Sequence, residues 1–124
     1  MKIKNKWPSY TTAEIKSAVN ILNSNKVNYW SGEHGKAFEK DFSKHFNVGF
    51  SIALSNGTVA LDLALRALDI GPGDEILFCS HTMVATASAI KFTGASPIPV
   101  EAGPDHLMDP RSIEHLITEN TKGI

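Results

Sequence analysis

The stretch LSNGTVAL, Leu54 to Leu61, combines residue types that suit an anion-binding turn. An apolar segment precedes it and a helical pattern follows, so the turn lies where a strand meets a helix. Gly57 permits a dihedral or a close approach that a side chain would block. The first amides of a helix, here near Thr58 and Val59, have no intrahelical acceptor. Together with the Thr58 hydroxyl and the positive end of the helix dipole, they predict a site for a negatively charged group, stabilised by about 0.3–1 kcal/mol, or roughly 2 kcal/mol when partly buried.

The same turn has a simpler interpretation. Ser55, Asn56 and Thr58 also suit the capping of a helix, and spacing alone does not decide between a cap and an anion site. No Gly-Lys-Ser/Thr sequence follows, so the turn is not a P-loop, and it lacks the three glycines of a dinucleotide fingerprint.

A second polar turn, SHTM, follows the apolar run ILFC. His81 and Met83 lie in this turn, and His81 is a candidate acid or base. Cys79 ends the apolar run and is the only cysteine, which excludes an internal disulfide or a multi-cysteine metal site. A buried, inert thiol is the favoured interpretation of Cys79, and we expect no metal site.

The elements that position these turns follow from hydrophobic spacing. Strands alternate with helices after residue 49, which predicts βαβ units and a mostly parallel sheet. Because the strand DEILFC is continuously apolar, we expect helices on both of its faces, as in an α/β three-layer sandwich. The predicted helices span 11–22, 36–46, 58–70, 82–92 and 111–117, and the predicted strands span 50–54, 74–79 and 96–101.

Several residues refine this outline. Thr11 and Glu14 form the pattern of a capping box. Phe38, Phe42 and Phe46 recur every four residues on one helical face, which predicts a core stripe rather than a cofactor-binding surface.

The prolines of the later part of the chain also carry information. Pro97 and Pro99 cannot donate to a ladder, so the strand 96–101 is expected near an edge of the sheet or paired on one side only. Asp109 and Pro110 suit the N-cap and the first position of the helix 111–117.

The end of the chain, ENTKGI, reads as a polar exit from a helix that leads into another strand, which we expect to continue. We divide the chain into a helical segment, 1–48, and the first βα units of a larger domain, 49–124.

Composition narrows the class of protein. The 124 residues are 42% hydrophobic and 20% charged, with a formal net charge of −1. Such a balance is typical of a globular protein, and neither a nucleic acid nor a membrane is an expected partner. A cytoplasmic location is the default expectation.

Residues 54–124 resemble the DegT/DnrJ/EryC1/StrS family, and the likeness extends over nearly the whole chain. The matching segments are SNGTVALDLALRALDIGPGDEILFCSHTMVATASAIKFTGASPIPVE and MDPRSIEHLITENTKGI. Members of this family are sugar aminotransferases that depend on pyridoxal 5′-phosphate and have the aspartate aminotransferase fold, fold type I. The resemblance implies that this chain is the N-terminal part of the large, cofactor-binding domain.

The resemblance also implies roles for individual residues. Gly57, Thr58 and Val59 would hold the cofactor phosphate. Met83 stands where relatives commonly carry an aromatic ring that stacks on the cofactor's pyridine, and its thioether can also cover an aromatic face, at about 0.3–1.5 kcal/mol. His81 would lie on the loop that enters the site, where it is a predicted substrate-binding residue.

The segment YWSGEHG, Tyr29 to Gly35, resembles the family's approach to the sugar substrate. It implies substrate-binding roles for Tyr29 and Ser31, with the segment reaching its substrate across a dimer interface. The alternative is an ordinary turn with an aromatic anchor. The implied substrates are a nucleotide-linked keto-sugar and an amino donor, typically glutamate, and the implied assembly is a homodimer.

The family reaction needs a lysine that binds the cofactor aldehyde and an acidic residue opposite the pyridine nitrogen. The resemblance places both downstream of Ile124, and Lys91 is better interpreted as a solvated helix residue. We therefore expect no catalytic residue in this chain and no activity from it alone. Two alternatives stay open: a dehydratase that uses the same cofactor with histidine in place of the lysine, and a non-catalytic phosphate-binding domain.

Overall fold

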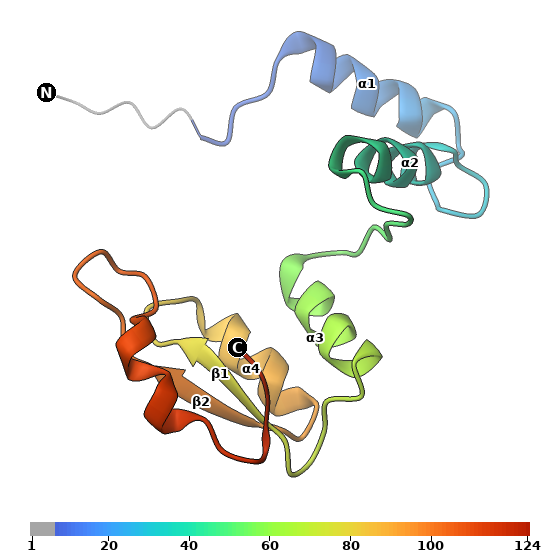
Figure 1. The fold of residues 1–124 in the computed structure, drawn as a ribbon. Helices are drawn as coiled ribbons and strands as arrows, with labels where there is room; N and C mark the ends of the chain where they lie inside the picture. Colours follow the sequence, from blue (N-terminus) through green and yellow to red (C-terminus); the bar gives the residue numbers. More distant parts are fainter. Residues whose placement is uncertain (1–6) are drawn as a thin grey trace, which may run out of the picture. The chain divides into compact units, whose positions relative to one another are not determined.

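The structure is a computed structural model that describes residues 7–124. The chain forms two compact units, residues 1–53 and 54–124, and each is described by itself (Figure 1). No helix in the described part of the chain combines the length and the hydrophobicity needed to cross a lipid bilayer.

The first unit begins with helix α1, Thr12–Asn23, and its capping box is confirmed. The backbone amide of Glu14 donates to Thr11 Oγ1 at 3.3 Å, and the amide of Thr11 donates to Glu14 Oε2 at 2.6 Å. These two bonds satisfy donors that a helix start would otherwise leave unpaired. The hydrogen bonds from Thr11 lower the pKa of Glu14.

Helix α2, His34–Phe46, carries the aromatic stripe. Its rings contact each other, with centroids 5.9 Å apart for Phe38 and Phe42 and 4.5 Å apart for Phe42 and Phe46. The expectation that the stripe is core is wrong within the described residues, because the three side chains keep 42–57% of their surface exposed. Among residues 7–53, α1 and α2 are the only regular elements, and neither buries these rings.

The predicted strand 50–54 is also not formed. A strand needs a neighbouring ladder, and none of the described strands pairs with this segment. The segment is instead attached to α2, since Ser51 Oγ donates to the Glu39 carbonyl and the Ala53 amide donates to the Glu39 carboxylate. Phe50 is 94% exposed as a result.

The second unit alternates helices and parallel strands, as predicted. Helix α3, Gly57–Ala67, precedes strand β1, Glu75–Cys79, and helix α4, Val84–Phe92, connects β1 to strand β2, Ser96–Val100. The sheet order is β2-β1-β3, where β3 is Thr121–Gly123. The α/β class with a parallel sheet is confirmed.

The register explains where the prolines fit. β1 pairs with β2 from Glu75 opposite Ser96 to Cys79 opposite Val100. Among the described strands β2 has β1 as its only neighbour, so Pro97 and Pro99 lie in an edge strand, as expected.

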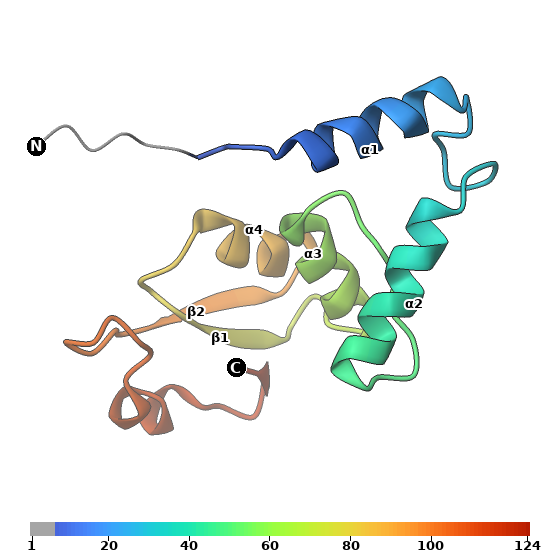
Figure 2. The same cartoon turned by 90° about the horizontal axis from the view of Figure 1, so that it is seen from above.

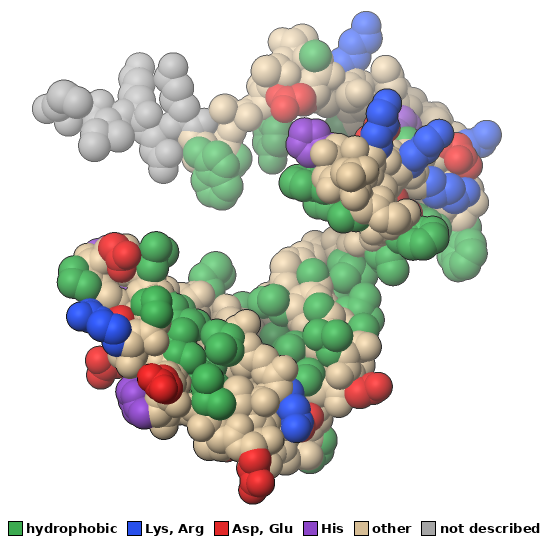
Figure 3. Space-filling model, viewed as in Figure 1, with side chains coloured by type: hydrophobic (Ala, Val, Ile, Leu, Met, Phe, Trp, Pro, Cys, Tyr) green, Lys and Arg blue, Asp and Glu red, His purple; other side chains and the backbone are tan. Residues whose placement is uncertain are grey.

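The core of the second unit lies between the sheet and its helices. Ile76, Ile90 and Ala95 are buried together, and Leu65 and Phe78 pack against them. Figure 2 shows α3 and α4 on one face of the sheet and the segment after β2 on the other. Hydrophobic side chains are nevertheless visible on the surface of both units (Figure 3).

The segment after β2 corrects one prediction. Asp109 caps it as expected, because its Oδ1 accepts from the Arg111 amide at 3.0 Å. Two 3-10 turns, Pro110–Ser112 and Glu114–Leu116, replace the predicted α-helix. A 3-10 turn rises about 2.0 Å per residue against about 1.5 Å for an α-helix, which suits a short segment that leads directly to β3.

Gly94 provides a test of this fold. It follows α4 with a φ of +93°, and a Cβ there would lie 2.8 Å from Pro72 Cγ. We expect Gly94→Ala to lower the free energy of unfolding by about 1–3 kcal/mol, measured by urea denaturation of the full-length protein.

Gly71→Ala is the matched control for this variant. A Cβ at Gly71 would meet its nearest neighbour, the Thr93 carbonyl oxygen, at an ordinary 3.8 Å. Equal stability of the two variants would contradict the packing of Gly94 against Pro72.

Candidate functional site

The first candidate site is the start of α3. Asn56 is the N-cap, and its side chain accepts a hydrogen bond from the Val59 amide at 3.0 Å. The cap interpretation is therefore correct for Asn56. The amides of Gly57 and Thr58 have no intrahelical acceptor, because the first helical bond runs from the Ala60 amide to the Asn56 carbonyl. They can therefore serve a bound anion, whereas the Val59 amide would have to leave the Asn56 side chain.

The surroundings of Gly57 indicate why a glycine occupies this position. Gly57 is the first residue of α3 and does not adopt a left-handed φ. A Cβ built on it would meet no heavy atom within 4 Å. Neither the backbone conformation nor a neighbouring protein atom requires glycine here, and the open space fits the close approach of a bound group.

The second candidate turn precedes α4. Met83 is its N-cap residue and is 76% exposed, so its side chain is not part of the core. Arg66 Nη2 donates to the Phe92 carbonyl at 3.1 Å, which joins the C-terminal ends of α3 and α4. Figure 1 shows the two helices running in the same direction, and both begin on the side of the unit where β1 ends. In open α/β sheets, ligands bind on that side.

His81 lies in the same turn as Met83. Its ring stacks on His106, with centroids 4.8 Å apart and planes inclined by 30°. Both histidines are exposed, and His106 has a left-handed φ of 65°. Within residues 7–124, no three histidine, cysteine, aspartate or glutamate side chains gather to hold a metal ion.

Tyr29 and Ser31 lie in the first unit, apart in sequence from the turns above. The Tyr29 hydroxyl donates to Glu39 Oε2 at 3.0 Å, and this bond raises the pKa of Tyr29. The Ser31 hydroxyl and amide both donate to Asn28 Oδ1, at 3.0 and 2.9 Å. Both predicted substrate-binding hydroxyls therefore already donate hydrogen bonds within their own unit.

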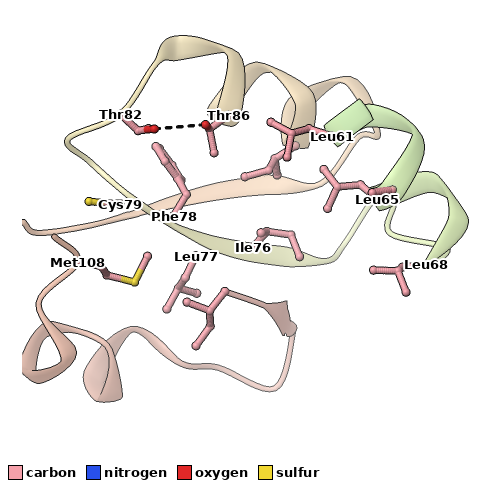
Figure 4. Close-up of a pocket in the computed structure, with 13 residues that line it drawn as sticks. Leu61, Leu65, Leu68, Ile76, Leu77, Phe78, Cys79, Thr82, Thr86 and Met108 are labelled. Atoms are coloured by element: carbon pink, nitrogen blue, oxygen red, sulfur yellow. Dashed lines mark hydrogen bonds between the residues drawn. The ribbon is translucent and has the colours of Figure 1, made fainter. Parts of the chain in front are cut away.

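The second unit also contains a cavity of about 350 Å³ (Figure 4). It lies along the edge of β1 where β3 is too short to pair, since β3 reaches only Glu75 and Ile76. Its lining is apolar except for the hydroxyls of Thr82 and Thr86, which are 3.4 Å apart. None of the predicted site residues lines it. A cavity without a charged lining does not suit a phosphate, and we interpret it as incompletely filled core.

Two residues with a structural role at these turns escaped prediction. Glu39 looked like one more polar position of an amphipathic helix, because its partners Tyr29 and Ala53 are 10 and 14 residues away. His106 belongs to no sequence motif that predicts a contact, because the residue on which its ring stacks, His81, is distant in the sequence.

Comparison with known proteins agrees with this geometry. Residues 8–124 match the DegT/DnrJ/EryC1/StrS aminotransferase family. The chain is 39% identical over 114 residues to dTDP-3-amino-3,4,6-trideoxy-alpha-D-glucose transaminase of Streptomyces venezuelae, covering 90% of this chain and 30% of that protein.

Solved structures give the same result. An aminotransferase from Psychrobacter cryohalolentis superposes with a TM-score of 0.90 at 40% identity, over 95% of this chain and 30% of that one. NtdA from Bacillus subtilis, solved with bound cofactor PMP, gives a TM-score of 0.81 at 34% identity, over 90% and 26% of the two chains.

The chain thus spans about 30% of the length of the relatives that it matches. Its fold corresponds to the N-terminal portion of the large domain of aminotransferases that use pyridoxal phosphate. The chain belongs to the DegT/DnrJ/EryC1/StrS aminotransferase family.

Proposed function

We propose that the full-length protein is a cytoplasmic aminotransferase that uses pyridoxal 5′-phosphate to transfer an amino group, typically from glutamate, to a nucleotide-linked keto-sugar. The observation that carries this proposal is the start of α3, where Gly57 leaves open space beside amides with no intrahelical acceptor. Family membership and the named activity of the Streptomyces relative support the reaction class and the sugar substrate.

In this proposal Gly57, Thr58 and Val59 hold the cofactor phosphate. The Gly57 and Thr58 amides and the Thr58 hydroxyl donate to its oxygens, and the positive end of the α3 dipole attracts its charge. Val59 joins them when its amide leaves the Asn56 side chain, which accepts it at 3.0 Å in this structure. Asn56 thus satisfies the amide in the absence of an anion.

Met83 covers one face of the cofactor ring in the same proposal. It precedes α4, and its exposed side chain is available for such a contact. Sulfur contacts with aromatic rings contribute about 0.3–1.5 kcal/mol. His81, two residues earlier, lies on the loop that enters the site.

This chain supplies binding and orientation rather than proton or bond chemistry. When bound, pyridoxal phosphate supplies an electron sink. We place the lysine that binds its aldehyde, and the acidic partner of its ring nitrogen, outside residues 1–124. We also propose a homodimer, in which a site is completed by both subunits.

Substitution of Gly57 tests the phosphate contact. In the full-length protein we expect Gly57→Val to weaken pyridoxal phosphate binding about 10- to 100-fold, because its side chain fills the space beside the amides and charge-assisted hydrogen bonds contribute about 1.5–3 kcal/mol. The dissociation constant is measured by absorbance titration of the cofactor-free protein. Gly49→Val is the control, since a Cβ at Gly49 also meets no atom within 4 Å. Equal affinity of both variants and the wild type would contradict the proposal.

Substitution of Met83 tests the ring contact. We expect Met83→Phe to bind the cofactor as tightly as the wild type or more tightly, and Met83→Asp to bind it more weakly because an unpaired charge would lie against the ring. Because Met83 is exposed, neither change should disturb folding, which circular dichroism checks. Unchanged affinity in Met83→Asp would place the ring elsewhere.

The chain of residues 1–124 alone tests where the reactive lysine lies. We expect no aminotransferase activity from it, because a positioned lysine lowers the barrier by about 7–11 kcal/mol and a random surface lysine does not. The purified chain is mixed with pyridoxal phosphate, reduced with borohydride and mapped by mass spectrometry. Stoichiometric labelling of one lysine, with turnover of a keto-sugar nucleotide, would show that the chain contains the reactive residue.

A further inference from the structure

Residues 101–109, which follow β2, form a short hairpin that we call the histidine hairpin. Ala102 and Met108 pair in an antiparallel bridge, and the Gly103 amide donates to the Leu107 carbonyl at 2.8 Å. In Figure 1 the hairpin extends from the end of β2, on the side of the second unit where the turn before α4 lies. The backbone bonds give this hairpin a defined shape beside the candidate site.

His106 lies near the tip of the histidine hairpin in a backbone conformation that more often belongs to glycine. The His106 amide donates to the Gly103 carbonyl at 2.9 Å, and the φ of His106 is +65°. Short hairpin loops commonly place glycine in this left-handed conformation, because a Cβ is strained there. The backbone alone therefore favours glycine at position 106, and a histidine in its place points to a role for the side chain.

The ring of His106 contacts the turn 80–83, which leads from β1 to α4. It stacks on His81 with centroids 4.8 Å apart and planes inclined by 30°. Stacked rings at such a distance attract each other in a preferred geometry. The contact joins two loops that follow the paired strands β1 and β2. The histidine hairpin is thus attached to the turn 80–83 by a ring contact within the second unit.

The ring contact lies between two backbone bonds of the turn. The Ser80 amide extends the pairing of β1 with β2 by donating to the Val100 carbonyl at 2.9 Å. At the other end of the turn, the Met83 carbonyl accepts from the Thr86 amide at 3.1 Å. His81 lies between these two bonds, so its ring contact restrains the part of the turn that separates them.

We propose that His106 is a positioning residue of the cofactor site, which stacks on His81, fixes the turn 80–83 and so holds Met83 in place. The thioether of Met83 is exposed and has three rotatable bonds, so a fixed backbone limits the space that it can reach. The contact of Met83 with the cofactor ring rests on the proposed function. The restraint of the turn by His106 does not.

His106→Gly separates this role from a contribution to folding. Glycine suits the left-handed φ, so we expect the full-length variant to unfold in urea at the wild-type midpoint or above it. Loss of the ring should still release the turn, and backbone amides of residues 80–86 should exchange hydrogen about two- to tenfold faster, measured by mass spectrometry. His115→Gly, at another exposed histidine of the same unit, is the matched control and should leave this exchange unchanged.

Nuclear magnetic resonance of the full-length protein, labelled with 13C-histidine, gives a signature of the stack itself. Each imidazole lies over the other, so ring currents shift the carbon-bound protons of both rings. In His106→Gly we expect the resonances of His81 to move toward those of an unstacked histidine. His106→Phe restores a flat ring, and we expect it to recover both the shifted resonances and the slower exchange of the turn.

A double-mutant cycle on cofactor binding tests whether His106 acts through Met83. We expect His106→Gly to weaken pyridoxal phosphate binding about two- to tenfold, the range of one sulfur–aromatic contact, and His106→Phe to bind as the wild type does. In a Met83→Ala background, His106→Gly should change the dissociation constant less than about twofold, because the side chain that His106 positions is then absent. An effect of equal size in both backgrounds would overturn action through Met83.

The arms of the experiment fail separately. Unchanged exchange and unchanged His81 resonances in His106→Gly would overturn the restraint of the turn, and a lower urea midpoint would assign the histidine to the stability of the fold. Faster exchange with wild-type cofactor affinity would overturn the positioning of Met83. If Met83→Asp binds the cofactor as the wild type does, the proposed ring contact fails and the positioning of Met83 with it, while exchange and resonances still decide whether His106 restrains the turn.

Discussion

The parallel pairing of β1 with β2 over five residues is the constraint on which the second unit depends. Parallel neighbours require a crossover connection, and α4 supplies it. The crossover fixes the turn that carries His81 and Met83 at the end of β1. Arg66 of α3 bonds to the end of α4, and α3, which begins at Gly57, starts on the same side of the unit as this turn (Figure 1). The positions of the two candidate turns thus depend on this strand pair, its crossover helix and the Arg66 contact.

The first unit depends on side-chain hydrogen bonds more than on burial. Neither α1 nor α2, the helices described in residues 7–53, has a fully buried residue, and the aromatic stripe is half-exposed. Thr11 and Glu14 fix the start of α1, and Glu39 connects α2 to segments before and after it. Such bonds specify geometry while contributing only about 1 kcal/mol each to net stability. Residues 28–35 owe their shape to these bonds and to Gly32 and Gly35, where an added Cβ would lie 2.6 Å from the Lys26 carbonyl oxygen and 3.2 Å from the Tyr29 ring.

The features predicted correctly from the sequence are local ones. The capping box of Thr11 depends on residues three positions apart, and the edge placement of Pro97 follows from its missing N–H. The predictions that failed required knowledge of distant partners. Residues 50–54 have the apolar pattern of a strand but no ladder beside them, and the stripe at Phe42 has the spacing of a core face but no layer above it.

In the candidate site, too, the local features could be predicted and the contacts between distant residues could not. The cap at Asn56 and the open position of Gly57 could be anticipated from a turn between a strand-like run and a helix. The sequence could not show whether glycine is needed at position 57 for its φ or for a close approach, because the answer depends on the backbone conformation and the surrounding atoms. The contacts of Glu39 and His106 join residues distant in sequence, which no spacing rule reveals.

The claim that the start of α3 holds the cofactor phosphate is tested most directly by a thermodynamic cycle on the full-length protein. Affinities for pyridoxal phosphate and for pyridoxal, which lacks the phosphate, are measured in the wild type and in Gly57→Val. We expect the wild type to prefer the phosphorylated form by about 10- to 100-fold or more, and this preference to fall markedly in Gly57→Val, because the two changes remove the same contact. An equal preference in both proteins would contradict it.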